Sequence, residues 1–84
     1  MRAVNLARQI AADHFAECQA NKKLFEHRVE NDIRLVGLSP LMVQLIIRIA
    51  VALFIFWISN KKTEVQSVLT EDERLYLELH GLYE

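Results

Sequence analysis

The sequence predicts an all-α protein, in which a single transmembrane helix is flanked by a long N-terminal amphipathic segment of one or two helices and by a short C-terminal helix. Three observations predict this class. Residues 40–59 are almost wholly apolar, the first 36 residues contain neither Pro nor Gly, and a helix-capping motif lies near the C-terminal end. The chain therefore divides into an N-terminal amphipathic helical segment (1–37), a transmembrane helix (38–60) and an acidic C-terminal tail with a short capped helix (61–84).

The apolar run reads PLMVQLIIRIAVALFIFWIS, and its only polar residues are Gln44, Arg48 and Ser59. Twenty helical residues cover about 30 Å, which is the thickness of the hydrocarbon core of a bilayer. We expect Ser39 to cap the first turn and Pro40 to occupy the first helical position, where its missing N–H costs nothing.

The C-terminal end of the run has the residues that usually mark a membrane interface. An aromatic side chain near the headgroups followed by cations is typical of the end of a transmembrane helix. The predicted interfacial anchors are Trp57, Lys61 and Lys62.

Arg48 makes insertion of this run more costly. Twelve Leu, Ile, Phe and Val side chains contribute about −5 kcal/mol to insertion, whereas an arginine at the helix centre costs about 3 kcal/mol, so insertion stays favourable. Because the run contains no acidic residue, we expect the partner of Arg48 to be a carboxylate of another chain or a lipid phosphate. An arginine that snorkels without a dedicated partner is the alternative.

The polar and small residues of the run gather on one side of the predicted helix. Interhelical contacts in membranes favour such residues, so we expect this face to pack on other proteins. The predicted interaction face consists of Gln44, Arg48, Ala52 and Ser59, and the opposite face carries Ile46, Ala50, Leu53 and Trp57.

A water-soluble protein with a buried hydrophobic helix would contain a run of the same length. The run is hydrophobic on nearly all sides, and the flanking segments have few large apolar residues with which to cover it. We therefore favour the membrane span over a soluble core.

The N-terminal segment, residues 2–36, has helical composition and an apolar stripe at three- and four-residue spacing. A break is expected in the sequence QANKK (19–23), an i,i+4 pair between Glu30 and Arg34, and a helix end at Gly37. The stripe is too narrow and too rich in alanine for an independent core, so it should pack on a partner helix or lie on the membrane surface. Its predicted packing residues are Phe15, Phe25, Val29 and Ile33.

The C-terminal tail contains a capping box, because Thr70 is followed three residues later by Glu73. The spacing predicts a helix from about Glu71 to His80, ended by Gly81. We expect its apolar side to dock on another surface, since so short a helix is unstable alone. That side is predicted to carry Leu75, Leu79 and Leu82.

The residues that carry chemistry are few. His14 and Cys18 are four residues apart and could reach one metal ion, but two ligands do not make a site. No phosphate-binding loop, nucleophile elbow or pair of catalytic carboxylates is present, and the net charge of −1 does not indicate nucleic acid. We therefore predict neither an enzyme nor a bound cofactor or metal.

We interpret the chain as a small single-pass structural or accessory subunit of a larger membrane-associated assembly, with other membrane protein subunits and the lipid bilayer as its partners. The alternative is a viral (bacteriophage) virion-membrane, ejection or holin-like protein that associates with copies of itself. A regulatory peptide of one transporter or enzyme is a third interpretation. The expected location is a bacterial or mitochondrial inner membrane or a virion membrane. The N-terminus is placed on the cytoplasmic or matrix side, because the acidic tail is the easier one to translocate.

Overall fold

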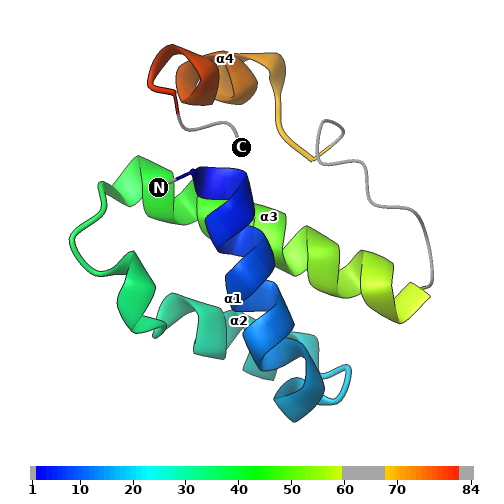
Figure 1. Cartoon of the computed structure of the whole chain (residues 1–84). Helices are drawn as coiled ribbons and strands as arrows, with labels where there is room; N and C mark the ends of the chain where they lie inside the picture. The colour runs from blue at the N-terminus through cyan, green and yellow to red at the C-terminus, as the bar shows by residue number, and fades with distance from the viewer. Residues whose placement is uncertain (1, 60–67, 82–84) are drawn as a thin grey trace.

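The computed structural model describes residues 2–59 and 68–81, and all regular structure in these ranges is helical. The all-α prediction is therefore confirmed. Figure 1 shows α1 and α2 lying against α3, with α4 close to the first turns of α1 and α3. The elements are α1 (Ala3–Cys18), α2 (Lys22–Glu30), the 3₁₀ turn η1 (Ile33–Leu35), α3 (Pro40–Ser59) and α4 (Glu71–Leu79).

The N-terminal segment forms two helices, and the break falls within the predicted QANKK sequence. Gln19 and Ala20 both have positive φ angles, 46° and 67°, so the chain leaves the helical path directly after α1. Asn21 then starts α2, because its Oδ1 accepts a hydrogen bond from the Leu24 N–H at 3.1 Å.

The predicted pair between Glu30 and Arg34 is wrong, because α2 ends at Glu30. Asp32 follows in extended conformation, and its Oδ1 accepts the Arg34 N–H at 2.9 Å to begin η1. The Arg34 side chain therefore bonds to Asp32 and not to Glu30. Gly37, with φ 88°, turns the chain between η1 and α3.

Helix α3 begins as predicted. Pro40 is its first residue, and Ser39 Oγ accepts the Met42 N–H at 3.3 Å. By length and composition, α3 can cross a membrane.

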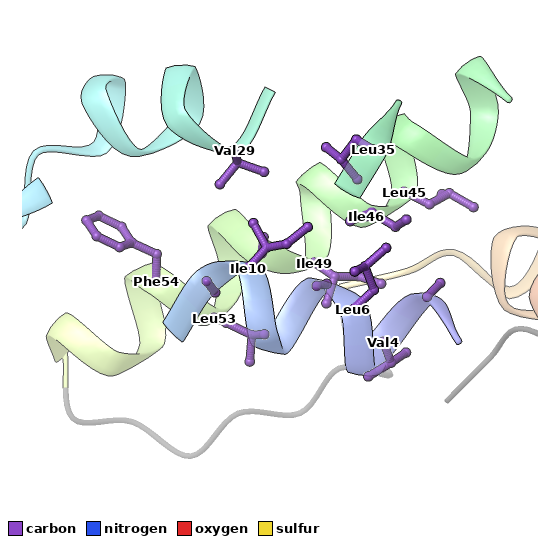
Figure 2. Close-up of a cluster of buried hydrophobic side chains, with 14 of the residues drawn as sticks. Val4, Leu6, Ile10, Val29, Leu35, Leu45, Ile46, Ile49, Leu53 and Phe54 are labelled. Carbon is purple, nitrogen blue, oxygen red and sulfur yellow. The ribbon is translucent and has the colours of Figure 1, made fainter. Parts of the chain in front are cut away.

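One face of α3 forms the core of the molecule with α1 and α2, as Figure 2 shows. Ala3, Ala7 and Ala11 lie on the buried face of α1 between larger residues, and their small size lets the two helices approach closely. The expectation that the flanks could not cover α3 is thus wrong for this face. Its buried residues are Met42, Leu45, Ile46, Ile49, Ala50, Leu53 and Phe54.

Aromatic side chains close the core near the C-terminal end of α3. The ring of Phe25 stacks on Phe54 with centroids 4.1 Å apart, and Phe15 meets both Phe54 and Trp57 edge-on at 5.5 Å. Three residues of the predicted packing stripe, Phe15, Phe25 and Val29, therefore pack within this chain.

Ile33, the fourth residue of the stripe, is 82% exposed. Because α2 ends before it, Ile33 no longer follows the helical periodicity of the stripe.

Helix α4 has the predicted capping box but docks through a different face. The Glu73 N–H donates to Thr70 Oγ1 and the Thr70 N–H to Glu73 Oε1, at 3.2 and 2.9 Å. Leu77 is buried, whereas Leu75 is exposed and Leu79 is 82% exposed, so the predicted Leu75 and Leu79 side is wrong. Leu77 lies one turn after Glu73, and these two side chains face the rest of the chain together. Leu82 lies outside the described residues.

The close approach of α1 to α3 can be tested at Ala7, which is fully buried. Ala7→Leu should lower the free energy of unfolding by about 1–3 kcal/mol, because the added methyl groups have no space. Ala12 lies on the exposed side of the same helix, so Ala12→Leu should change it by less than about 0.5 kcal/mol. Urea titration monitored by circular dichroism measures both values, and equal effects would contradict the packing of α1 on α3.

Candidate interaction surface on helix α3

The side of α3 that faces away from α1 carries a second apolar stripe. Leu41, Ile55 and Ile58 remain 44%, 41% and 45% exposed, although each is a large aliphatic residue. The residues of this side follow one another at alternating intervals of three and four, which is the heptad spacing of helices that pack on other helices. We name as the outer stripe the residues Leu41, Gln44, Arg48, Val51, Ile55 and Ile58.

The predicted interaction face overlaps this stripe only in part. Gln44 and Arg48 lie in the stripe and are exposed, whereas Ala52 is half-buried beside it. Ser59 is exposed at the helix end, where its hydroxyl donates to the Ile55 carbonyl at 2.7 Å. A spacing of four alone selected Gln44, Arg48 and Ala52. The alternation of three and four would also have selected the exposed aliphatic residues of the stripe.

The predicted interfacial anchors are placed differently from the expectation or not described. Trp57 packs on Phe15 of α1 and is half-buried. Lys61 and Lys62 lie outside the described residues.

Arg48 has a carboxylate partner within its own chain, so the expected partner from another chain or a lipid is wrong. Its Nη1 donates to both carboxylate oxygens of Glu73 on α4. Helix periodicity could not indicate this pair, because 25 residues separate Arg48 from Glu73 in the sequence. The Arg48 side chain is nevertheless about half exposed, so a molecule that binds the outer stripe can still contact it.

Glu73 is bound from two directions. It closes the capping box of α4 through the Thr70 backbone N–H and also accepts from Arg48. The Thr70 backbone N–H and then the Arg48 guanidinium lower the pKa of Glu73 below its ordinary value, against the opposing effect of its partial burial. The ionised Glu73 thereby connects the start of α4 to the middle of α3.

A groove of about 400 Å³ runs between α2 and the outer stripe. Its apolar lining comes from Ile47 and Val51 of α3, and its α2 wall carries the carboxylates of Glu26 and Glu30. Glu26 has Lys22 at 3.7 Å, whereas Glu30 forms no ion pair with any residue in the described ranges. Arg48, which is paired with Glu73, also lines the groove, so the groove offers two carboxylates and one guanidinium beside an apolar floor.

A polar cluster fastens α1 to the turn that precedes α3. His14 contacts Asp32 Oδ2 through Nε2 at 2.9 Å and Glu17 Oε1 through Nδ1 at 2.7 Å. Arg34 bridges Asp32 and Asp13 at 2.7 and 2.8 Å. The Arg34 guanidinium holds the pKa of Asp32 well below its usual range, so this carboxylate is ionised in the folded chain.

The same contacts set the protonation of His14. Burial lowers the pKa of His14, but the hydrogen bonds and charges of Glu17 and Asp32 outweigh burial and raise it above 6.5. Within the described ranges no three His, Cys, Asp or Glu side chains come together as metal ligands. His14 therefore has a structural explanation, since it joins two carboxylates from different parts of the chain.

The stability of the fold should depend on pH through His14. Because the folded pKa of His14 is higher than the unfolded one, protonated His14 stabilises the fold fully below about pH 6.5, and this contribution is lost as pH rises through the folded pKa. Urea unfolding from about pH 5.5 to 8.5 should thus show a decrease that His14→Gln removes. The exposed His27 provides the control, because His27→Gln should retain the decrease. A decrease that persists in His14→Gln would contradict the role of this cluster, in which Asp13, Glu17, Arg28, Asp32 and Arg34 are the charged groups around His14.

The outer stripe and the acidic groove adjoin each other on one side of the molecule, and both include Gln44, Arg48 and Val51. They form a surface suited to binding another helix, with apolar contacts along its length and charge near its middle. Comparisons of the chain with protein-family models, with curated proteins and with solved structures found no match.

Proposed function

We propose that this chain is a small structural or accessory subunit of a larger membrane-associated assembly, and that it joins its neighbours through the outer stripe of α3. One observation carries the proposal: α3 is apolar on two sides, and the described residues 2–59 and 68–81 cover only one of them. Exposed aliphatic residues that follow one another along a helix are typical of sites where another protein binds.

The polar residues of the stripe favour a protein neighbour over bare lipid. Gln44 and Arg48 interrupt the aliphatic residues in the middle of the stripe, where acyl chains offer them no hydrogen-bond partner. A protein surface can supply acceptors there and apolar contacts at both ends. Burying the exposed parts of Leu41, Ile55 and Ile58 would contribute roughly 1 kcal/mol each.

The docking role of the stripe can be tested at Ile55. Ile55→Asp should reduce co-purification of neighbouring subunits with the tagged chain about tenfold, because it places a charge in the interface. The free energy of unfolding should change little, since Ile55 lies outside the core.

Leu79 provides the matched control, because it is an exposed aliphatic residue on α4, away from the stripe. Leu79→Asp should leave co-purification from the native source unchanged. If Leu79→Asp and Ile55→Asp act equally, or if neither acts, the outer stripe is not the docking surface.

A second candidate function is that of a single-pass membrane anchor, and the length and apolar composition of α3 favour it. Insertion of α3 would separate it from α1 and α2 and break the contact between Arg48 and Glu73. The amphipathic α1 and α2 would then lie at the headgroups with their apolar sides in the membrane. The N-terminus would face the cytoplasm or matrix under this proposal.

Cys18 distinguishes the two candidates, because it is the single cysteine of the chain and is buried in the structure. A maleimide should label Cys18 slowly if α1 stays on α3, since burial protects the thiol and raises its pKa. Insertion of α3 should expose the thiol and make the chain resist extraction from membranes by alkaline carbonate. Ala16→Cys in a Cys18→Ser chain gives an exposed control that is labelled in both cases.

The single-pass candidate also predicts the effect of Arg48→Leu. This substitution removes the charge that opposes insertion by about 3 kcal/mol, so it should increase the carbonate-resistant fraction. Arg8→Leu, on the exposed side of α1, should not. The anchor would be excluded if alkaline carbonate extracted the unmodified chain, Arg48→Leu and Arg8→Leu completely, and if Cys18 stayed protected from maleimide in each.

A further inference from the structure

We propose that the outer stripe binds a second copy of this chain, with the two α3 helices antiparallel across a two-fold axis. This inference rests on the proposed function, because it names the occupant of the same docking surface. A homodimer with two-fold symmetry requires a surface that is complementary to itself. The outer stripe meets this requirement in both its spacing and its charge.

The spacing determines how two antiparallel stripes would align. The six positions of the stripe alternate between heptad positions a and d. In an antiparallel pair, each a position of one helix lies opposite a d position of the other. The midpoint of the stripe falls between Ile49 and Ala50. About this point Leu41 lies opposite Ile58 of the second copy, Gln44 opposite Ile55, and Arg48 opposite Val51.

The antiparallel direction also staggers the two arginines by three residues, about 4.5 Å along the helix axis. A parallel pair in the same register would place Arg48 against Arg48, and two like charges at one level repel each other. In the antiparallel pair each Arg48 meets the aliphatic Val51 of the other copy. The stagger reduces the repulsion between the two arginines relative to the parallel pair, so Arg48 favours the antiparallel direction.

Charge complementarity supports the same arrangement. Val51 lines the α2–α3 groove together with Glu26 and Glu30, so a side chain opposite Val51 enters that groove. Arg48 of the second copy is the side chain at this place. Within the described residues Arg48 donates to Glu73 through Nη1 alone, which leaves its Nε and Nη2 for the carboxylates of the groove.

These carboxylates disfavour a lipid in the groove. An acyl chain gives Glu26 and Glu30 no hydrogen bond, and anionic headgroups would repel them. A helix with a cation at the centre of an apolar stripe can make apolar contacts with the floor of the groove and an ion pair with the carboxylates of its wall. α3 of a second copy has this pattern.

Disulfide cross-linking tests the direction of the pair. In a Cys18→Ser chain, the double variant Gln44→Cys and Ile55→Cys should form a cross-linked dimer under mild oxidation, because these positions lie opposite each other in the antiparallel pair. The single variant Gln44→Cys should not cross-link, whereas a parallel pair would cross-link through it. Sedimentation of the unmodified chain should show a dimer.

A charge exchange tests the groove. Glu30→Lys should weaken the dimer up to about fivefold, and adding Arg48→Glu should restore it, because the attraction across the interface is re-established with reversed signs. Glu78 is an exposed carboxylate on α4, so Glu78→Lys serves as the control with no effect on the dimer. Because Arg48 and Glu30 of one chain line the same groove, a mixture of a Glu30→Lys chain with an Arg48→Glu chain isolates the contact between copies. The mixed pair should bind more tightly than either variant binds itself, and equal affinities would contradict the contact.

A chain that sediments as a monomer at all concentrations, in buffer and in detergent, and does not cross-link overturns the homodimer. So does cross-linking through Gln44→Cys alone. In that case the proposed function stands if Ile55→Asp still removes co-purified subunits, and the stripe then binds a different protein. If Ile55→Asp also has no effect on co-purification, both proposals fail.

Discussion

Helix α3 has more apolar surface than the rest of the described chain can cover, and the other features follow from this constraint. Its inner face is filled by α1 and α2, whose alanines allow close packing and whose Phe25 stacks on Phe54. Its outer face keeps large aliphatic residues in contact with solvent. A second exposed apolar face on a helix is typical of a surface that contacts lipid or another protein.

Arg48 affects whether lipid or protein can contact the outer face of α3. It occupies the middle of the outer face, about half exposed, with Glu73 on one side and the acidic groove on the other. In a transmembrane helix without a protein neighbour, Arg48 would make the free energy of insertion less favourable, because insertion removes its water and separates it from Glu73. On the surface of the folded chain it connects α4 to α3 and presents unused donors to a neighbour. Carboxylates of another protein could accept from these donors, whereas acyl chains offer no acceptor.

Local signals in the sequence predicted the helices and most of their ends, although α2 ends at Glu30 and not at the predicted Gly37. The break after Cys18, the cap at Ser39 and the capping box at Thr70 each depend on a few adjacent residues, and the structure has all three. Contacts between distant residues could not be predicted in this way. The pair of Arg48 and Glu73, the bonds of His14 and Arg34 to Asp32, and the burial of Leu77 all depend on how the helices fold back on one another. The alanines of α1 show the difference most clearly, because small residues add little to an apolar stripe but determine how closely two helices approach.

The division of α3 into two faces bears on the kind of neighbour it has. Lipid tails form no fixed pattern of holes, so a helix in contact only with lipid needs no particular spacing of its large side chains. The outer stripe keeps a strict alternation of three and four residues through Gln44 and Arg48, at positions separate from those buried against α1. Polar residues at such positions lower stability but fix the register and direction of paired helices. Regular spacing with two polar interruptions is typical of a helix that pairs with another helix. In the proposed antiparallel pair, Arg48 of one copy lies beside the groove that carries Glu26 and Glu30 of the other.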